Sequence, residues 1–380
     1  MAEPKKIALA LPSIEATAVD YLAEVVKQNW VTSGGPAVTK FENQLREFLQ
    51  TDREVVALNS GTAALHLALK LAGVQRGDFV LCQTMSFVAS SNPIAYLGAI
   101  PVFIDSEKST YNLALEYVKE AIKWCLKQNK KPAALVAVHS FGIPCQVEEI
   151  AKLCKDYEIP LIEDAAEALG SRYNDQACGL FGDYGILSFN GNKIITTGGG
   201  GALICKDAQK TEEARHLSRQ AKSTTTGFEH DAVGFNYAMP GLNAALGLSQ
   251  LHTLKERIQK KWELHQFYQE CFAEIKEIEV LSVQNEEYYA NYWLTVIRFT
   301  GSNLTKNPER FQAFLAEKGI ESRFPWKPLH LQEIYDEQHY FGAQHAESLW
   351  KTGLCLPSGC GLTKEDLNRI QQAINAYFSA

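Results

Sequence analysis

The sequence contains no apolar run of about 18 residues, the length that a membrane-spanning helix needs. The apolar stretch nearest the N-terminus, residues 7–11, is too short for the core of a signal peptide. An excess of basic residues is also missing, because 37 Lys and Arg residues stand against 44 Asp and Glu residues, a net charge of −7. This balance argues against a general nucleic-acid binder, which neutralises phosphates with a basic face. It leaves an anionic small substrate open, since a pocket can be locally basic.

Groupings of cysteine or histidine that would indicate a disulfide framework or a metal site are absent as well. The nine cysteines are odd in number and scattered, with no Cys-x-x-Cys pair. The nine histidines show no metal-ligand spacing, and neither a nucleophile elbow nor a P-loop occurs. We therefore expect a reduced cytoplasmic protein without a metal centre, bound to neither nucleic acid nor membrane.

What the sequence does contain is an ordinary globular composition in a chain long enough for more than one core. Its 380 residues are 46% hydrophobic and 21% charged, and a chain of this length favours two to three folding units. Residues 55–205 alternate short apolar runs with amphipathic stretches, which predicts α/β layers around a mostly parallel sheet. Strands are predicted at 55–58, 79–82, 100–104, 134–138, 159–162, 186–189 and 201–205, and helices near 62–72, 88–97, 114–128, 146–157 and 207–221.

The pattern changes after residue 240. Residues 242–276 carry leucines, Ile258 and Trp262 at helical spacing, which predicts one long helix. A strand at 292–299 and helices at 308–318 and 364–378 follow, and they indicate a smaller α+β unit. We expect a large domain of residues 1–245 and a second domain of residues 246–380 that begins with a linker helix.

The first candidate for chemistry is the turn from Asn59 to His66. A strand ends at Leu58, and a small-residue turn with Gly61 leads into an Ala/Leu-rich helix. A helix N-terminus offers free N–H groups and a positive dipole end, so this turn could bind a phosphate. A plain strand-to-helix turn with a Ser or Thr cap has the same pattern. The turn alone does not decide between the two.

The second candidate is Asp164, in the sequence Ile162-Glu-Asp-Ala-Ala-Glu167. An acidic residue at the carboxyl end of a strand in an open α/β sheet lies at the edge where ligands bind. Such a carboxylate could support a protonated ring nitrogen, coordinate Mg²⁺ or bind a ribose. It could equally be a solvated carboxylate that the helix dipole favours.

The third candidate is Lys193, which follows a predicted strand and precedes the four glycines 198–201. The glycines come before a strand and not before a helix, so they do not form a dinucleotide-binding loop. A lysine in apolar, glycine-rich surroundings can form a Schiff base, although most lysines are solvated surface charges. Together, a phosphate turn, an acid at a strand end and a later lysine match what pyridoxal 5′-phosphate needs.

At this point the sequence resembles the DegT/DnrJ/EryC1/StrS sugar aminotransferases, which have the aspartate aminotransferase fold (fold type I). The resemblance covers nearly the whole chain. It runs through the segments 30–36, 40–42, 60–69, 163–166, 188–193, 196–201 and 234–237. It implies an α/β fold in which a large, mostly parallel-sheet domain binds pyridoxal 5′-phosphate and a smaller α+β domain follows.

The resemblance also implies roles for individual residues. Lys193 matches the Schiff-base lysine, which also moves the proton between the donor and the cofactor. Asp164 matches the partner of the ring nitrogen, and Phe87 matches the aromatic residue that stacks on the cofactor ring. The phosphate cradle is expected from Gly61, Thr62 and Ser188. Asn236 matches a residue that reaches the phosphate from the partner subunit of a homodimer.

Two positions depart from the common family pattern. Many relatives carry Gln or His at the position of Glu167, near the cofactor hydroxyl, where a carboxylate could be protonated or turned away. Most relatives read Ser-Phe-His-x-x-Lys, whereas this chain has Asn190. The form Ser-Phe-Asn-Gly-Asn-Lys resembles a branch that aminates C4 of a UDP-linked 4-keto-6-deoxy-N-acetylhexosamine, as in bacillosamine synthesis, with glutamate as the usual amino donor of such families.

The segment 323–331 resembles the same branch. Its two cations, its imidazole and its aromatic plane suit a nucleoside diphosphate with a base to stack on. An extended, proline-stiffened loop at the domain junction is the alternative. The expected substrate contacts are Thr32, Ser33, Asn190, Arg323, Trp326, Lys327 and His330.

Three rival functions follow from the same fold. A sugar 3-dehydratase is disfavoured, because that branch replaces the lysine or carries an iron–sulfur cysteine set. An aminotransferase for a dTDP- or GDP-linked keto sugar stays open, as does a non-catalytic regulator that binds a sugar nucleotide. The intact set of Lys193, Asp164 and Ser188 argues against the regulator.

Overall fold

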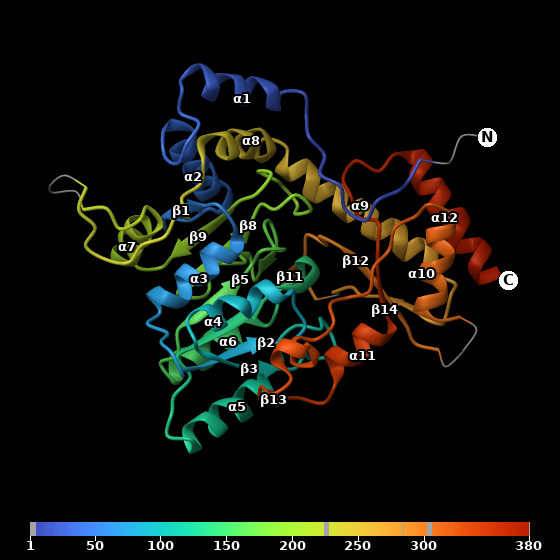
Figure 1. Cartoon of the computed structure of the whole chain (residues 1–380). Helices are drawn as coiled ribbons and strands as arrows, with labels where there is room; N and C mark the ends of the chain where they lie inside the picture. The colour runs from blue at the N-terminus through green and yellow to red at the C-terminus, as the bar shows by residue number, and fades with distance from the viewer. Residues whose placement is uncertain (1–4, 224–227, 284, 302–305, 380) are drawn as a thin grey trace.

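The centre of the computed structural model is an eight-stranded sheet (Figure 1). Its strands are β1 (Val55–Leu58), β2 (Phe79–Gln83), β3 (Ile100–Ile104), β4 (Ala134–Val138), β5 (Leu161–Asp164), β8 (Tyr184–Ser188), β9 (Gly201–Cys205) and β13 (Tyr340–Phe341). Their order is β1-β9-β8-β5-β4-β2-β3-β13. Strand β9 runs antiparallel to both neighbours, and the other pairings are parallel. The structure describes residues 5–223, 228–283, 285–301 and 306–379.

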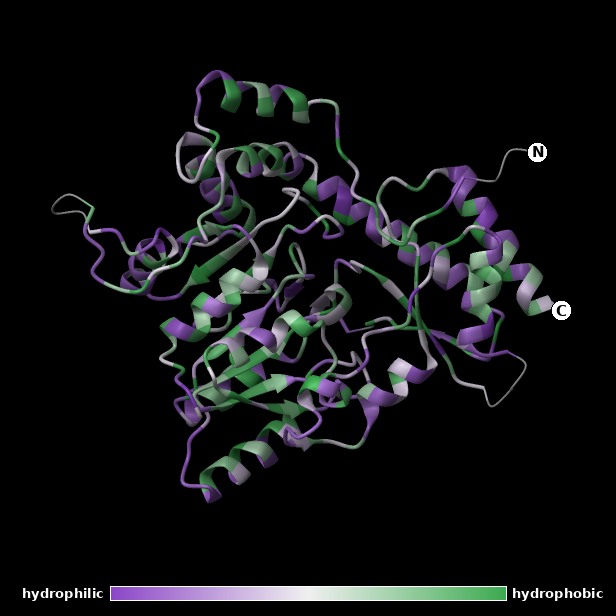
Figure 2. Cartoon of the chain, in the orientation of Figure 1, coloured by the Kyte–Doolittle hydropathy of each residue, from purple (hydrophilic) through white to green (hydrophobic). Residues whose placement is uncertain are grey.

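Helices cover both faces of this sheet, because successive strand residues point to opposite sides. In β1, Val56 and Leu58 pack on one face, while Val55 and Ala57 pack on the other. The first face carries α3 (Gly61–Leu71), α4 (Asn92–Tyr96) and α7 (Ala208–Ser218). The second carries α2 (Pro36–Leu49), α5 (Leu115–Lys127), α6 (Val147–Asp156) and α8 (Gly241–Leu251). Hydrophobic colour accordingly follows the strands and the inward helix faces in Figure 2.

The predicted strands and helices of the first half are confirmed, with small shifts in their bounds. Strand β5 begins two residues later than expected, and β8 begins two residues earlier and ends one residue earlier. The helix expected at 88–97 is divided into a 3₁₀ turn, Val88–Ser90, and α4, which has a proline in its first turn. The α/β fold with a mostly parallel sheet is thereby confirmed.

The prediction of a single long helix over residues 242–276 is wrong. The chain forms α8, which packs on α1 (Ala18–Lys27), and then α9 (Leu254–Phe272). Between them, Thr253 bends the backbone: its N–H and its hydroxyl both donate to the carbonyl of Gln250. Glu15 then accepts hydrogen bonds from the side chains of Thr253 and Gln250. Helical hydrophobic spacing continues through this break, which is why the sequence pattern does not reveal it.

The C-terminal part forms its own small core. An antiparallel sheet of β10 (Ile278–Val280), β12 (Thr295–Phe299) and β14 (Gly353–Leu356) packs against α10 (Pro308–Glu317), α12 (Lys364–Ser379) and the end of α9. Ile7 joins this core, so the N-terminal segment lies beside α12 at the same side of Figure 1. Helix α9 begins in the core under β1 and ends in this one. The division between residues 245 and 246 stays a proposal.

Shorter elements complete the fold. A third sheet joins β11 (Tyr288–Tyr289), β6 (Arg172–Tyr173) and β7 (Gln176–Ala177), and α11 (His345–Thr352) lies between β13 and β14. Among the helices of the described ranges, none has the length and apolar character to cross a membrane.

Candidate active site

All residues predicted for the cofactor site except Asn236 meet in one cavity of about 260 Å³. It lies where β5 and β8 end side by side and α3 begins, which is the sheet edge where ligands bind in open α/β folds. Larger surface hollows lie at residues 151–161 and along α10, and neither contains a predicted site residue. The predicted residues that line the cavity are Gly61, Thr62, Phe87, Asp164, Glu167, Ser188, Asn190 and Lys193.

One end of the cavity is a cradle for an anion. Ser60 caps α3, because its hydroxyl accepts the N–H of Ala63 at 3.0 Å. The N–H groups of Gly61 and Thr62 have no carbonyl within the helix to bind, so they are available to a ligand. A Cβ at Gly61 would lie 3.0 Å from the Cβ of Ser188 and 3.3 Å from its hydroxyl oxygen. Only glycine lets the helix start approach this hydroxyl so closely, and these donors suit a phosphate. The turn is therefore both capped and able to bind an anion.

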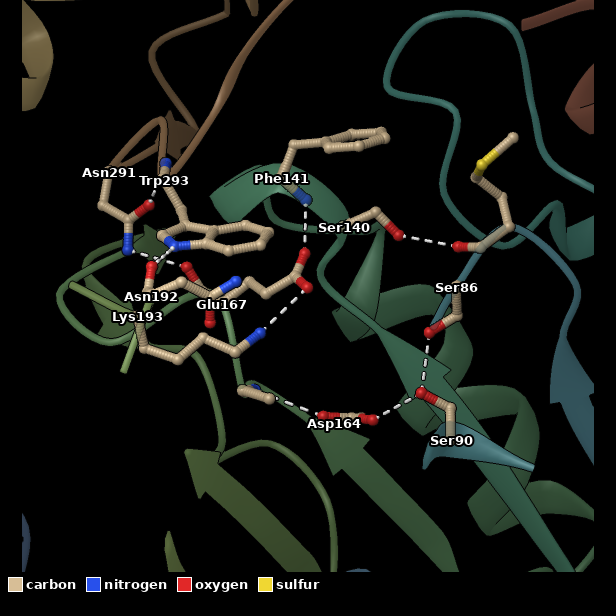
Figure 3. A network of polar contacts seen from close by, with 12 residues as sticks. Ser86, Ser90, Ser140, Phe141, Asp164, Glu167, Asn192, Lys193, Asn291 and Trp293 are labelled. Atoms are coloured by element: carbon tan, nitrogen blue, oxygen red, sulfur yellow. Dashed lines mark hydrogen bonds and ion pairs between the residues drawn. The ribbon is translucent and has the colours of Figure 1, made fainter. Parts of the chain in front are cut away.

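Asp164 is fixed as an acceptor at the end of β5. One of its carboxylate oxygens accepts the hydroxyl of Ser90 at 2.7 Å, and the other accepts the N–H of Ala166 at 3.2 Å (Figure 3). Ser90 in turn shares a hydrogen bond of 2.6 Å with Ser86. The carboxylate is 7% exposed and lines the cavity. A buried, hydrogen-bonded carboxylate of this kind can hold a protonated ring nitrogen in place.

Lys193 and Glu167 form an ion pair inside the cavity. The ammonium lies 3.0 Å from one oxygen of Glu167, and the other oxygen accepts the N–H of Phe141 at 2.9 Å (Figure 3). Burial raises the pKa of Glu167 above its usual value, although the Lys193 charge and the Phe141 N–H act in the opposite direction. In the structure the carboxyl group is turned toward the lysine, and its state beside a bound cofactor, protonated or turned away from the cofactor hydroxyl, stays a prediction.

Sequence reasoning missed the residues that surround this pair. The ring of Trp293 lies under the Lys193 ammonium, which is 4.2 Å from the ring centroid. Asn291 is fully buried, and its amide donates to the carbonyl of Glu167 at 2.9 Å. Both residues belong to the segment before β12, far from the strand ends in sequence. The only sequence signal in this region is the apolar run at 292–299, which predicts a strand but gives no indication of a contact with the lysine.

Three of the predicted residues that do not line the cavity of this single chain belong to the N-terminal part and to the segment 234–237. Thr32 and Ser33 are exposed and precede α2, and the carbonyl of Thr32 accepts the N–H of Gly241 at 2.7 Å. Asn236 is also exposed, and its carbonyl accepts the side-chain amide of Asn59 at 2.9 Å. Its side chain is therefore not needed for that contact. Their roles stay predictions.

The segment 323–331 divides into residues held within the protein and residues open to solvent. Trp326 stacks on Phe141, with centroids 4.8 Å apart and planes 14° apart. Arg323 is exposed, and its guanidinium lies 2.7 Å from Glu321. Lys327 is exposed as well. None of them lines the cavity.

The ring of His330, in the same segment, has a polar partner at each nitrogen and stacks on another ring with one face. Its Nδ1 shares a hydrogen bond of 2.7 Å with the Thr84 hydroxyl, and its Nε2 lies 3.4 Å from Glu347. Its ring stacks on Tyr340 at 3.8 Å. Burial lowers the pKa of His330 despite the nearby carboxylate. The exposed cations of the segment are therefore Arg323 and Lys327.

Comparison with known proteins decides the family. The model of the DegT/DnrJ/EryC1/StrS aminotransferase family matches residues 12–375. The chain belongs to this family.

EpsN of Bacillus subtilis (strain 168) is 38% identical over 98% of this chain and 96% of its own length. GDP-perosamine synthase of Escherichia coli O157:H7 is 33% identical over 99% of each chain. The aminotransferase TlmJ of Streptoalloteichus hindustanus superposes with a TM-score of 0.90 at 29% identity, over 98% of this chain and 99% of its own.

Membership of the DegT/DnrJ/EryC1/StrS family confirms three expectations from the sequence. The resemblance to this family is correct, the fold is that of fold type I, and the cofactor of the family is pyridoxal 5′-phosphate. The residues that line the cavity fit that cofactor, because they combine an anion cradle, a buried carboxylate and a lysine. The role of each residue stays a prediction.

Proposed function

We propose that this protein transfers an amino group from glutamate to C4 of a UDP-linked 4-keto-6-deoxy-N-acetylhexosamine, with pyridoxal 5′-phosphate as cofactor. The product would serve amino-sugar and glycan biosynthesis. The main support is that Lys193, the anion cradle and Asp164 line the same cavity. All nine cysteines are free thiols, which suits a reducing compartment, and we place the reaction in the cytoplasm.

Different cavity residues would bind different parts of the cofactor. Gly61, Thr62 and Ser188 would bind its phosphate, and Phe87, which is 55% exposed at the cavity, would stack on its ring. Asp164 would hold the ring nitrogen protonated. When bound, the cofactor supplies an electron sink that stabilises negative charge on the donor α-carbon.

Lys193 would be both the covalent anchor and the proton carrier. Once the donor amine has taken its place on the cofactor, the free Lys193 amine would take the proton from the donor α-carbon and deliver it to the cofactor carbon bonded to the donor nitrogen. The same lysine works in the opposite direction when the 4-keto sugar accepts the amine. Glu167 lies 3.0 Å from the amine, so it would keep the released lysine close to the reacting atoms.

The sugar-nucleotide part of the proposal depends on Asn190 in the cavity and on predicted residues outside it. Asn190 lines the cavity beside Lys193 and would contact the sugar. Arg323 and Lys327 present exposed cations that would hold the diphosphate, while Trp326 and His330 would face the base. Thr32 and Ser33 would complete the sugar contacts.

The nucleotide is the part of the proposal with a specific competitor. A GDP-perosamine synthase is 33% identical to this chain over its full length, which favours a GDP-linked ketone as the second candidate. A dTDP-linked ketone would need the same cavity chemistry. Assays with UDP-, GDP- and dTDP-linked 4-keto sugars distinguish the three. A clear preference for GDP or dTDP would overturn the UDP assignment and leave the aminotransferase assignment standing.

Variants of the loop cations test how the nucleotide is bound. Arg323→Ala or Lys327→Ala should raise the KM for the sugar nucleotide and leave the half-reaction with glutamate nearly unchanged, because that half-reaction uses only cofactor and donor. Lys364→Ala removes an exposed cation elsewhere and should change neither value. Equal losses in both half-reactions would mean that the loop supports the fold and not the nucleotide.

We also propose a homodimer in which Asn236 completes the cavity of the other subunit. Inactive Lys193→Ala and Asn236→Ala subunits, mixed at random, should regain activity in about a quarter of the sites, because one site of each heterodimer is intact. Heterodimers that form without any activity would refute the shared site, provided that Asn236→Ala alone is inactive.

A further inference from the structure

The amine of Lys193 contacts two groups, and only one of them is a charged partner. The carboxylate of Glu167 lies 3.0 Å from the amine, and the amine also lies over the ring face of Trp293, whose centroid is 4.2 Å away. The lysine side chain is 13% exposed and Trp293 is 3% exposed. A cation over an indole face is attracted by the ring quadrupole, and the attraction is strongest where water is excluded.

Trp293 is fixed in this position by three hydrogen bonds. Its indole N–H donates to the carbonyl of Asn192 at 2.7 Å (Figure 3), and its backbone N–H donates to the side chain of Asn291 at 2.8 Å. Its carbonyl accepts the ammonium of Lys261 at 2.7 Å, from inside the protein. The ring therefore has little freedom to turn away from the cavity.

The bond to Asn192 ties the ring to the lysine loop itself, because Asn192 directly precedes Lys193. This hydrogen bond links the position of the ring to the position of the loop that carries Lys193. Trp293 leads into β12 of the C-terminal core, so this contact is made by a part of the chain distant in sequence. A second indole, Trp326, lies parallel to Trp293 with centroids 6.3 Å apart, and it supports the ring from its own segment.

We propose that Trp293 is a positioning residue that holds the amine of Lys193 whenever this amine is not bonded to the cofactor. The inference rests on the proposed role of Lys193. A lysine that is released once in each half-reaction must stay beside the reacting carbon, and its four-carbon stem would otherwise sample many conformations. The ring face and the Glu167 carboxylate together define one place for the released amine.

The first test measures the amine directly in the cofactor-free full-length chain. A small acetylating reagent is applied, and the rate of modification at Lys193 is followed by peptide mass spectrometry, with the exposed Lys364 as the internal standard. Trp293→Leu should raise the Lys193 rate about tenfold, and Trp293→Phe, which keeps a smaller ring face, should raise it less. Trp262→Leu is the matched control, because Trp262 packs against the same core, where it stacks on Tyr289 and meets Tyr292 edge to face, and the Lys193 ammonium lies over Trp293 instead.

The second test measures the half-reaction with glutamate in the cofactor-loaded variants. Trp293→Leu should lower the maximal rate about tenfold with little change in the glutamate concentration that gives half of it, and Trp293→Phe should recover part of the loss. A purely structural role would lower thermal stability and affinity together and would show no recovery with phenylalanine.

The outcomes separate this inference from the proposed function. Equal acetylation of Lys193 in wild type and both Trp293 variants would overturn the inference, as would a loss confined to glutamate affinity. If Trp293→Leu does not fold, Trp293→Phe and wild type still decide the comparison. If the wild-type protein carries out no half-reaction with glutamate, the proposed function is wrong, and the acetylation rates still show whether Trp293 holds the amine.

Discussion

Replacing Asn291 by alanine should destabilise the protein strongly, because this side chain satisfies three buried backbone groups. Its amide donates to the carbonyls of Glu167 at 2.9 Å and Leu169 at 3.0 Å, and its oxygen accepts the N–H of Trp293 at 2.8 Å. Each group left unpaired in the interior costs about 1–1.5 kcal/mol, so Asn291→Ala should lower the free energy of unfolding by roughly 3–4 kcal/mol.

The surroundings of Asn291 leave little room for another group to replace its three hydrogen bonds. A Cβ at Gly142 would lie 1.9 Å from the Asn291 oxygen, and the φ of Gly142 is +83°, so the backbone there is already shaped around this side chain. Asn291→Asp keeps the volume but turns a carboxylate oxygen toward two carbonyls, and it should cost at least as much as alanine. Asn285→Ala, at an exposed position of the same segment, should change stability by less than about 0.5 kcal/mol.

Urea unfolding, followed by both tryptophan fluorescence and far-ultraviolet circular dichroism, measures these differences from the midpoint at constant slope. A loss below about 1 kcal/mol for Asn291→Ala would show that water or a local shift satisfies the three groups. The reasoning from their burial would then be refuted.

Three further predictions concern titratable groups. Asp164→Asn should fold normally and lose turnover about 100-fold or more, because an amide cannot keep a ring nitrogen protonated; near-full turnover in a steady-state assay would exclude the role. Glu167→Gln should lose about tenfold or less, since an amide oxygen can still accept one of the two hydrogen bonds; a loss as large as that of Asp164→Asn would contradict this. Burial lowers the pKa of His265 from 6.5 to about 4, so the neutral ring stabilises the fold above pH 6.5, and up to about 3 kcal/mol is lost as the pH falls toward 4. His265→Gln should flatten the dependence of unfolding free energy on pH in that range, and parallel curves for both proteins would refute the assignment.

Much of the large domain could be predicted from the sequence, because its signals are local. Each strand of the parallel sheet is a short apolar run, and each such run up to β9 was expected within about two residues of its place. The strand β13 escaped prediction, since Tyr340–Phe341 is too short to show a period. The break between α8 and α9 also escaped, because it depends on Glu15, which lies more than 200 residues earlier in the chain.

The residues of the candidate site likewise fall into those that local sequence signals predict and those that they do not. Gly61, Asp164 and Lys193 could be predicted because each stands at a strand end or a helix start, and the topology of the sheet brings these points together. Asn291 and Trp293 could not be predicted, because their contacts join the C-terminal part of the chain to the cavity and leave no motif in the sequence. The role of residues 323–331 was predicted from a resemblance and from their chemistry, and the structure shows that His330 and Trp326 are also packed inside the protein.

The most direct test of the central claim is to find the amine that carries the cofactor. The purified protein should be yellow, and borohydride should bleach the colour and abolish activity by fixing the cofactor to the amine that it is bonded to. Peptide mapping should then place the label on Lys193. The competing amine is Lys261, which is buried and whose pKa burial lowers to about 8, so that part of it is uncharged near neutral pH. A label on Lys261, or on any lysine other than Lys193, would contradict the account.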